Sequence, residues 1–507
     1  IADGDAGEFV VLRVPNGTDL VGYTFTDGDA TLSLANVTER GRVALSPDPD
    51  RARNRTDATV VGVDRLGLAN GGERLRIRRN GTVVDRAVYR DTEEGHLLTW
   101  NGTAPSWRPI GATDRPVVSA TDGQVRAFVL PDGPDVPIET LRNADDRILL
   151  AGYTLTSERV TDALVAAHER NVSVRVLLEG EPVGERTRQG ARRLDRLTAA
   201  GVEVRLIGGE HARYAYHHAK YAVVDDSALV LTENWKPAGT GGRDSRGWGV
   251  RIDSEAFAAE LASVFDHDAG WHDAVPWERF RAGRSFASEP AANGSFAGDR
   301  DPERLRAESV RLLTAPGNAG DALVAELDGA TRRVAVLQPT LGGPDQRLVR
   351  AAVAAARRGV EVRILLSSAW YAVDDNRKLA ERLNARADRE DLPLTVRLAR
   401  GGDRFGKVHA KGLLVDDTVV VGSVNWNDNS LSDNREVAVA LDGPPAGYFA
   451  DAFAADWRRG ATPGRGDGLP LSLVGAAAVA AVGALVVARR TVSFADGEGE
   501  RFEEWRT

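Results

Sequence analysis

The sequence predicts an α/β protein of two similar halves, preceded by an all-β immunoglobulin-like sandwich and followed by one C-terminal transmembrane helix. Three observations lead to this prediction: a repeated strand–helix–strand pattern, short alternating strands near the start, and an uncharged run near the end. The length of 507 residues allows about three domains. We expect the sandwich at 1–118, the halves at 119–272 and 306–460, linkers at 273–305 and 461–468, the membrane helix at 469–488, and a cytoplasmic tail at 489–507.

The composition excludes several classes of site. The chain has no cysteine, which excludes disulfides, thiolate nucleophiles, Cys-ligated zinc and iron–sulfur clusters. It also has no methionine, so we expect that an N-terminal piece, a signal peptide, has been removed. Only five of the 65 basic residues are lysines, against 74 acids, which fits either a salt-adapted surface or a GC-rich coding bias.

The N-terminal region reads as a β-sandwich. Short alternating runs such as FVVLRV, RVALS and RLRIRR are separated by Asn-Gly, Asp-Gly and Gly-Gly turns. The stretches GEFVVLRVPNGTDLVGYTFTDGD, LGLANGGERLRIRRNGTVVDRAVY and SWRPIGAT resemble a lamin-tail-type module. That resemblance implies a targeting or binding accessory, and no catalytic cluster stands out in this stretch.

The middle of the chain is an internal repeat. VRAFVLPDG (125–133) matches VRLLTAPGN (310–318), and DALVAAHERNVSVRVLLEG (162–180) matches RAAVAAARRGVEVRILLSS (350–368). Each unit is an apolar strand, an amphipathic helix and a β-branched strand, which predicts a sheet covered by helices on both faces. Two similar halves suggest a site at their interface.

The C-terminal run 469–488 has no charge and the length of a membrane-spanning helix. Arg489 and Arg490 follow it, so the positive-inside rule places everything before 469 outside the cell membrane. Seven Asn-X-Ser/Thr sequons, all before this run, are candidate glycosylation sites of an exported surface: Asn16, Asn36, Asn54, Asn80, Asn101, Asn171 and Asn293.

Near the end of each half the same polar residues recur at offsets of two, seven and 16 from a histidine. HHAKYAVVDDSALVLTENW carries His218, Lys220, Asp225 and Asn234, and VHAKGLLVDDTVVVGSVNW carries His409, Lys411, Asp416 and Asn425. Residues two apart on a strand point to the same side, so each histidine and lysine should share one face. An imidazole that attacks or donates a proton, beside fixed Lys and Asn donors, suits a phosphoryl group.

These motifs resemble the paired HxKxxxxD signature of the phospholipase D superfamily, over about 125–457. The resemblance implies two phospholipase D-type α/β/α halves that share one site, and a phosphodiesterase that uses neither metal nor other cofactor. One histidine would form a phosphohistidine while the other protonates the leaving alcohol, and the Lys and Asn side chains would hold the phosphate oxygens. By family analogy His218 is the nucleophile and His409 the acid, but the sequence leaves this assignment open.

The two halves differ in the residues before the asparagine. Family members carry Gly-Ser there, which the second half keeps as Gly422 and Ser423, whereas the first half has Leu231 and Thr232. We expect Thr232 to supply the hydroxyl that Ser423 supplies. We also expect the motif aspartates to fix their turns rather than contact phosphate.

The halves also differ in a supporting acid. Glu436 matches a family acid that orients a histidine ring, but Gly247 stands at the corresponding place in the first half. Asp244 is a candidate replacement. The missing acid is the reason that the nucleophile assignment stays open.

The substrate favoured by the sequence is a phospholipid, hydrolysed or transferred beside the membrane that anchors the protein. An extracellular metal-independent nuclease is the alternative, which the acidic balance disfavours because polyanions bind mainly to Lys and Arg. A catalytically inactive binding protein is the third alternative. A basic groove across both motifs would favour nucleic acid, and an apolar rim would favour lipid. The sequence leaves open the head-group preference, the choice between hydrolysis and transfer, and the oligomeric state.

Overall fold

The computed structural model describes residues 7–90, 95–100, 105–113, 115–209 and 212–463. The predicted membrane segment 469–488, the tail and the sequon at Asn101 lie outside these residues. Among the helices of the described part, none combines the length and apolar character needed to cross a bilayer. Residues Ile1–Ala461 form one compact unit, and the account below concerns that unit alone.

The region before the repeats is built almost entirely of strands. They form sheets with the orders β1-β4-β5, β3-β2-β6-β7 and β8-β9. Their bounds are β1 Val10–Val14, β2 Tyr23–Thr26, β3 Thr31–Ser33, β4 Gly41–Ser46, β5 Thr59–Gly62, β6 Arg74–Arg79, β7 Thr82–Val88, β8 His96–Trp100 and β9 Pro105–Pro109, with a short helix α1 at Pro49–Arg53. Phe25, Val43 and Leu45 lie in its small apolar core. The finer assignment as a lamin-tail-type sandwich stays a prediction.

The sequons in the described residues lie at the surface. Asn16, Asn36, Asn80 and Asn293 are exposed, as is Asn171, and Asn54 is half-buried. Asn80 and Asn171 have φ of 47° and 69°, a left-handed conformation that asparagine tolerates well in turns. Glycosylation at these positions stays a prediction.

Each repeat contributes one half of a continuous 16-stranded sheet. The first half contains β10 Val118–Leu130, β11 Arg147–Gly152, β12 Ser173–Glu179, β13 Glu203–Ile207, β14 Tyr221–Val224, β15 Ser227–Leu231, β16 Ser245–Asp253 and β17 Ala274–Pro276. Its helices are α2 Asp135–Arg142, α3 Glu158–Glu169, α4 Arg188–Ala199, α5 Glu255–Ala269 and α6 Trp277–Arg281.

The second half repeats the order from β10 to α5, adds β22 and α10, and has no counterpart of β17 and α6 among its described residues. Its strands are β18 Glu303–Ala315, β19 Arg333–Gln338, β20 Glu361–Leu366, β21 Leu394–Leu398, β22 Lys407–Val408, β23 Gly412–Val415, β24 Thr418–Gly422 and β25 Glu436–Asp442. Its helices are α7 Ala319–Gly329, α8 Arg347–Arg357, α9 Val373–Glu390, α10 Asp428–Ser432 and α11 Pro444–Arg459. The predicted α/β repeat is therefore present in both halves.

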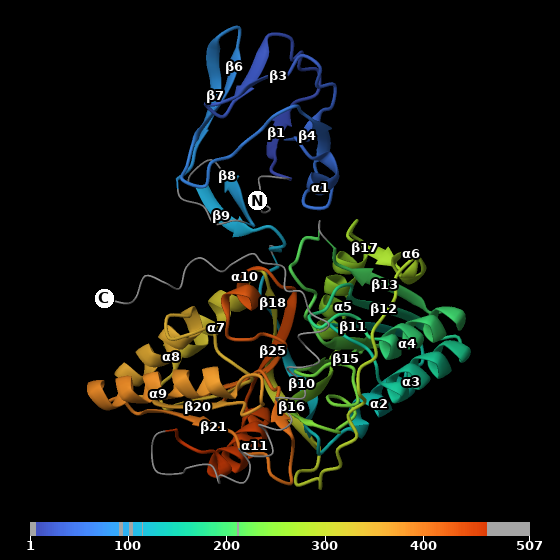
Figure 1. Ribbon diagram of the computed structural model, residues 1–507, viewed down its shortest axis with the longest axis vertical. Coiled ribbons are helices and arrows are strands. Elements are labelled where there is room, and N and C mark those ends of the chain that lie inside the picture. Colours follow the sequence, from blue (N-terminus) through green and yellow to red (C-terminus); the bar gives the residue numbers. More distant parts are fainter. Residues whose placement is uncertain (1–6, 91–94, 101–104, 114, 210–211, 464–507) are drawn as a thin grey trace, which may run out of the picture. The chain divides into compact units, whose positions relative to one another are not determined.

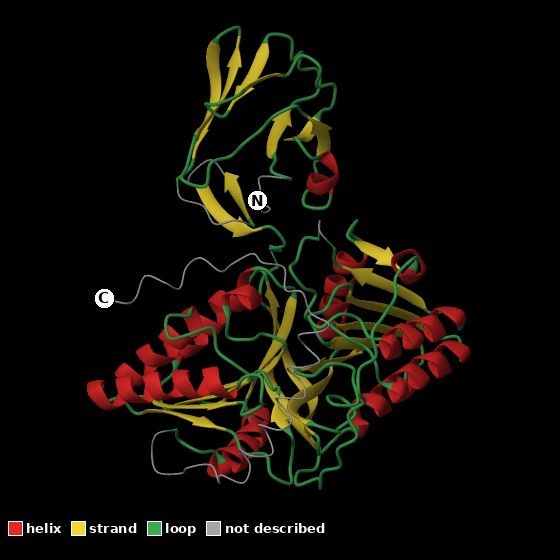
Figure 2. Ribbon diagram, viewed as in Figure 1, coloured by secondary structure: helices red, strands yellow, loops and turns green. Residues whose placement is uncertain are grey.

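The halves meet through their long strands β10 and β18, which pair antiparallel in the centre of the sheet (Figure 1). On either side of this pair the order is β16-β15-β14-β11-β12-β13 and β25-β24-β23-β19-β20-β21, so the two halves are topological copies. Strands β11, β12 and β13 are parallel, as are β19, β20 and β21, and helices pack along these strands in both halves (Figure 2). Their apolar runs are buried, as expected of a sheet covered on both faces.

The first half extends into the stretch predicted as a linker. Strand β17 pairs antiparallel with β13 through Val275 and Leu206, and the ring of Trp277 in α6 is buried against the same half. The turn-rich stretch that follows, 282–302, has no helix and no extended strand before β18 begins at Glu303. The segment that links the halves is therefore shorter than 273–305.

Candidate active site

Each motif forms a strand–turn–strand unit at the end of a half. Strands β14 and β15 pair antiparallel, as do β23 and β24, which confirms the predicted return of the chain. His218 and Lys220 lie directly before β14, and His409 and Lys411 lie directly before β23, rather than inside the strands. Because β14 runs antiparallel to β11, this places the motif at the carboxyl end of the parallel strands.

The motif aspartates hold the turns, as the sequence predicts. Asp225 and Asp416 have φ of 51° and 49°. The Asp225 carboxylate accepts three backbone N–H bonds, each 2.9 Å long, from the segment before β11. Asp416 does the same for the segment before β19 and also accepts the Thr331 hydroxyl at 2.8 Å. Burial alone would raise the pKa of Asp416, but these hydrogen bonds outweigh it and lower the pKa to about 2.

His218 is oriented by a carboxylate of the other half. Its Nδ1 lies 3.0 Å from both Oε1 and Oε2 of Glu436, which is fully buried at the start of β25. The Ser430 hydroxyl donates to the same carboxylate at 2.8 Å. Since a carboxylate only accepts, Nδ1 of His218 carries the proton and Nε2 keeps its lone pair. Glu436 therefore lies where a His-orienting acid was expected.

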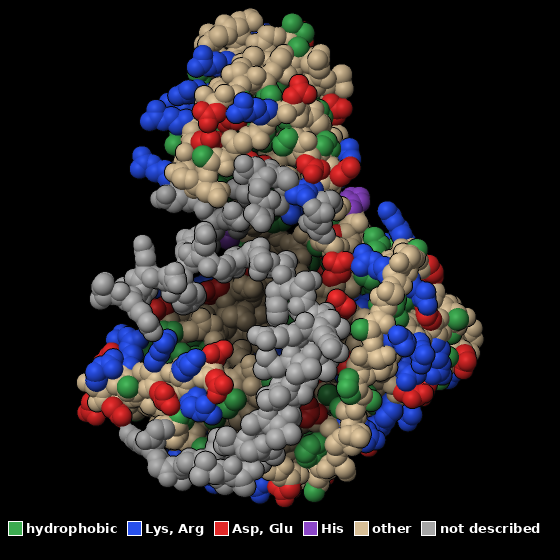
Figure 3. All heavy atoms as spheres, viewed as in Figure 1, with side chains coloured by type: hydrophobic (Ala, Val, Ile, Leu, Met, Phe, Trp, Pro, Cys, Tyr) green, Lys and Arg blue, Asp and Glu red, His purple; other side chains and the backbone are tan. Residues whose placement is uncertain are grey.

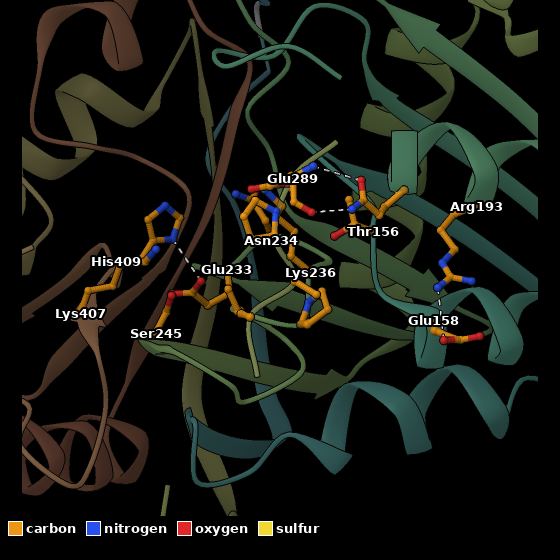
Figure 4. Close-up of a pocket in the computed structure, with 17 residues that line it drawn as sticks. Thr156, Glu158, Arg193, Glu233, Asn234, Lys236, Ser245, Glu289, Lys407 and His409 are labelled. Carbon is orange, nitrogen blue, oxygen red and sulfur yellow. Dashed lines mark hydrogen bonds and ion pairs between the residues drawn. The ribbon is translucent and has the colours of Figure 1, made fainter. Parts of the chain in front are cut away.

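His409 is oriented by Glu233, a residue that the sequence analysis did not single out. Nδ1 of His409 lies 3.1 Å from Oε2 of Glu233, and the Glu233 side chain is only 2% exposed (Figure 4). Asp244 instead forms an ion pair of 2.9 Å with Lys407. The expectation that Asp244 replaces the missing acid is therefore wrong, because its carboxylate is paired with Lys407 and Glu233 contacts the ring instead.

The reason for the glycine at 247 lies in this contact. Extending the pairing of β15 with β16 places Glu233 opposite Gly247, and extending that of β24 with β25 places Val424 opposite Glu436. A Cβ atom at position 247 would lie 2.3 Å from Cγ of Glu233. In the first half the carboxylate therefore comes from the chain directly after β15, whereas in the second half it comes from β25, the counterpart of β16. Two differences between the halves could have revealed this in the sequence: Glu233 stands where the second half has Val424, and Gly247 stands where it has Glu436.

A second exchange lies on the same strands. Leu231 pairs with Gly249, whereas its counterpart Gly422 pairs with Ala438. A Cβ at Gly249 would lie 2.2 Å from the Phe128 ring and 2.8 Å from the Leu231 side chain, and a Cβ at Gly422 would lie 2.4 Å from the Ala438 backbone. Neither glycine therefore has room for a side chain, and in the first half Phe128 and Leu231 together fill the space beside Gly249.

The two hydroxyls occupy equivalent places. Oγ1 of Thr232 accepts the Trp248 N–H at 2.9 Å, and Oγ of Ser423 accepts the Val437 N–H at 3.0 Å. Both residues are fully buried. The threonine therefore makes the bond that the serine makes in the other half, and this bond is to the backbone of the neighbouring strand.

The motif lysines are buried beside the histidines. The Lys220 ammonium donates to the carbonyl oxygen of His218, and the Lys411 ammonium donates to that of His409 at 2.7 Å and lies 3.1 Å from Nδ1 of the same ring. Burial lowers the pKa of Lys411 to about 8. Burial and the charge of Lys411 lower the pKa of Lys220 well below its ordinary value. Lys411 is therefore largely protonated at neutral pH and supplies positive charge to the site.

Both histidines are neutral in the free site at pH 7. Burial, with the charges of Lys220 and Lys411, lowers the pKa of His218 to about 4, although Glu436 acts in the opposite direction. Burial and Lys411 likewise lower the pKa of His409 to about 4 against the effect of Glu233. An anion bound between the lysines would offset their charge and allow one ring to take up a proton.

The backbone of each histidine is also held by the opposite half. The His218 N–H donates to the carbonyl oxygen of Arg435 at 2.9 Å, and the His409 N–H donates to that of Arg246 at 3.0 Å. Each arginine side chain forms a buried ion pair across the halves: Arg435 with Asp268 at 2.9 Å, and Arg246 with Asp456 at 3.0 Å. The site therefore exists only where the halves are assembled.

A pocket of about 320 Å³ with both polar and apolar walls opens beside His409. Asn234 and Glu233 lie on its wall with Lys236 and Lys407, and residues of the segment before β18 close one side (Figure 4). Asn234 has a buried side-chain oxygen without a protein partner. Asn425, its counterpart, is half-buried. The pocket thus combines charged and amide groups with alanine and proline side chains next to one of the two rings.

Comparison with known proteins identifies the family. The family model described as "Cardiolipin synthase, PLD-like domain" matches residues 138–269 and 323–457, which is more than half of the chain. The chain belongs to the phospholipase D-like family. It is accordingly an enzyme of the phosphodiesterase or phosphatidyltransferase class. A search of curated proteins found no match.

Several solved structures align with this chain, and one of those described below supports the fold. Phosphatidylserine synthase from Haemophilus influenzae Rd KW20 aligns with a TM-score of 0.52 and 16% identity, over 67% of this chain and 88% of that one. A polyphosphate kinase from Porphyromonas gingivalis aligns with a TM-score of 0.45 and 14% identity, over 73% of this chain and 56% of that one. Nuc, a phospholipase D family member from Salmonella typhimurium, aligns with a TM-score of 0.24 and 23% identity, over 30% of this chain and 95% of that one. Only the first of these alignments is close enough to support the fold.

Proposed function

We propose that this protein hydrolyses or transfers phosphatidyl groups at a phosphodiester, through a phosphohistidine. The observation that carries the proposal is the matched pair of rings, each with Nδ1 on a buried carboxylate of the opposite half. This contact leaves Nε2 of His218 for the substrate, whereas Nε2 of His409 lies 3.2 Å from the Lys411 ammonium and would face a phosphoryl group together with it. One neutral imidazole can attack phosphorus, and the other can hold the proton that the leaving oxygen requires.

In the proposed reaction Nε2 of His218 attacks phosphorus, and the bond between phosphorus and the leaving oxygen breaks. His409 gives its Nε2 proton to that oxygen. Water or a second alcohol then gives a proton back to His409 and attacks the phosphohistidine, which frees His218. Lys220 and Lys411, with Asn234 and Asn425, would stabilise the negative phosphoryl oxygens.

A lipid substrate fits the pocket beside the proposed acid. The leaving alcohol would be released next to His409, where Lys236, Lys407 and Asn234 offer polar contacts to a small head group. The matching family model is described by the name cardiolipin synthase, and one similar solved structure is a phosphatidylserine synthase. The cations of this pocket are paired with acids, Lys407 with Asp244 and Lys236 with Glu289, which does not favour a polyanion such as DNA.

The test is turnover by the full chain in mixed micelles with EDTA, offered phospholipid in one reaction and DNA in another. We expect release of head group, or a new phosphatidyl-alcohol when an alcohol is added. His218→Ala and His409→Ala should each abolish turnover, whereas His272→Ala, at an exposed histidine, should not change it. Cleavage of DNA alone would make the protein a nuclease, and near-normal turnover by either site variant would exclude the mechanism.

We also propose that residues 469–488 anchor the protein with its active site outside the membrane. The uncharged run followed by Arg489 and Arg490, together with the sequons before it, supports this orientation. Protease added to intact cells should remove the N-terminal region and both halves. Complete protection of the chain in intact cells would contradict the proposed orientation.

A further inference from the structure

Two equivalent loops carry large apolar side chains in solvent. After β12 the first half has the loop 180–187, and after β20 the second half has the loop 367–372. Val183 on the first loop is 75% exposed, and Trp370 and Tyr371 on the second are 88% and 50% exposed. Among the described residues of the two halves, the large hydrophobic side chains that are exposed to solvent are these three.

The first loop is linked to His218 through the side chain of Tyr153. The Val183 N–H donates to the hydroxyl oxygen of Tyr153 at 2.5 Å, and the Tyr153 ring packs edge-on against the His218 ring with centroids 4.9 Å apart. The backbone of Glu181 also donates to the Glu179 carboxylate at 2.8 Å. Val183 is therefore held outward at the His218 side of the site.

The second loop lies at the His409 side. Leu366 at the end of β20 pairs with Gln338, and Leu337 beside it pairs with Gly412 at the start of β23, so the loop leaves the sheet at the edge where His409 lies. The buried amide of Asn376 donates to the carbonyl oxygens of Pro339 and Ser367 at 2.8 Å, which fixes the base of the loop. Trp370 packs edge-on against Tyr371 at 5.7 Å. The loop thus presents its tryptophan without burying it.

The charges around this opening do not suit a polyanion. Arg284 pairs with Glu181 at 2.9 Å and Arg193 with Glu158 at 3.2 Å, like the two pocket lysines described above. Basic and acidic side chains are also interspersed over the face of these halves seen in Figure 3. An apolar rim around a polar, charge-balanced opening matches a lipid interface, where Trp and Tyr lie at the level of the head groups.

We propose that Val183, Trp370 and Tyr371 form an apolar rim that docks the active site onto the surface of a phospholipid bilayer. The rim brackets the site, so docking would bring the phosphodiester of a lipid to the histidines without removing its acyl chains from the bilayer. This inference rests on the proposed function for its substrate, but the docking can be measured without turnover. It also predicts that docking depends little on salt, because apolar contact supplies it.

The experiment uses the compact unit 1–461, which contains all four apolar cores and lacks the uncharged run 469–488. Val183→Ser/Trp370→Ser is compared with wild type and with Val84→Ser, an exposed valine outside the halves. Binding is measured by co-sedimentation with phosphatidylcholine vesicles, and turnover with a short-chain phospholipid below its aggregation concentration. We expect about tenfold weaker vesicle binding for the double variant and unchanged monomer turnover for all proteins.

Each other outcome has a defined meaning. Equal vesicle binding by wild type and double variant, or no binding by wild type, would overturn the docking surface. Loss of single-stranded DNA binding in the double variant, with vesicle binding unchanged, would make the aromatic pair a base-stacking platform and would overturn it too. Vesicle binding that depends on the rim, without turnover of any phospholipid, would support docking and refute the proposed function. Trp370→Phe should retain most of the binding.

Discussion

The side chain of Glu233 fills the space that a side chain at position 247 would need. A Cβ at Gly247 would lie 2.3 Å from Cγ and 2.7 Å from Oε1 of Glu233. In the second half the same two places hold Val424 and Glu436. Each histidine therefore has a buried carboxylate on Nδ1, but the two carboxylates come from different strands of their strand pairs.

This relationship predicts that the acid can be moved back. Glu233→Gln should lower kcat at least about 100-fold, because His409 loses the carboxylate that fixes its tautomer and its role as the acid, and should shift the pH profile of kcat. Gly247→Ala should also impair turnover by displacing Glu233, whereas Gly447→Ala, at a glycine with open space around it, should not. The measurement is kcat and KM as functions of pH.

The decisive variant is Glu233→Val/Gly247→Glu, which gives the first half the arrangement of the second. It should recover turnover to within about tenfold of wild type, since a carboxylate again reaches His409. A double variant that folds but is no more active than Glu233→Gln would show that the position of Glu233, and not its charge on His409, is what matters.

The motif aspartates should affect stability more than chemistry. Asp416→Ala removes a carboxylate that holds three backbone N–H groups and a hydroxyl, so we expect a loss of about 2 kcal/mol in the free energy of unfolding. Asp417→Ala next to it loses only a surface ion pair with Arg332 and should cost under about 0.5 kcal/mol. Urea unfolding measures both. A large fall in kcat for Asp416→Ala at full folding would instead give this carboxylate a direct role.

The buried ion pair between Arg435 and Asp268 should hold the halves together. Arg435→Met leaves a fully buried carboxylate without its partner, so it should destabilise the protein by about 3–5 kcal/mol. Asp268→Asn in the same chain should restore part of the loss, because it removes the unpaired charge. Thermal unfolding with turnover as a second readout checks this. Equal stability of wild type and Arg435→Met would contradict it.

The histidines should make stability fall with acid. The pKa values of His218 and His409 are about 4 in the folded protein, against an ordinary value of 6.5. Between pH 4 and pH 6.5 the unfolded chain therefore binds more protons than the folded protein. The free energy of unfolding is highest above about pH 6.5, and it falls by about 3 kcal/mol per ring as the pH is lowered to about 4. His218→Gln/His409→Gln should flatten this part of the profile, measured by denaturant unfolding at each pH. An unchanged slope would show that other groups cause it.

The sequence by itself determined the repeat, the two strand–turn–strand motifs and their histidine, lysine and aspartate residues. These features depend on local spacing, because alternation along a strand and the turn at Asp225 or Asp416 involve residues close in the chain. The glycine and leucine differences between the halves were also visible, but their meaning was not. The exchange of Glu233 and Gly247 for Val424 and Glu436 lies across neighbouring strands, so the strand pairing must be known before this difference can be interpreted.

Only the tertiary structure decided which acid serves which histidine. Glu233 and His409 are 176 residues apart, and His218 and Glu436 are 218 apart, so no local pattern links them. Each contact requires β10 and β18 to pair and bring the halves face to face. The short motifs identified the histidines and lysines of the site, whereas the orientation of the imidazole rings follows from packing between distant segments.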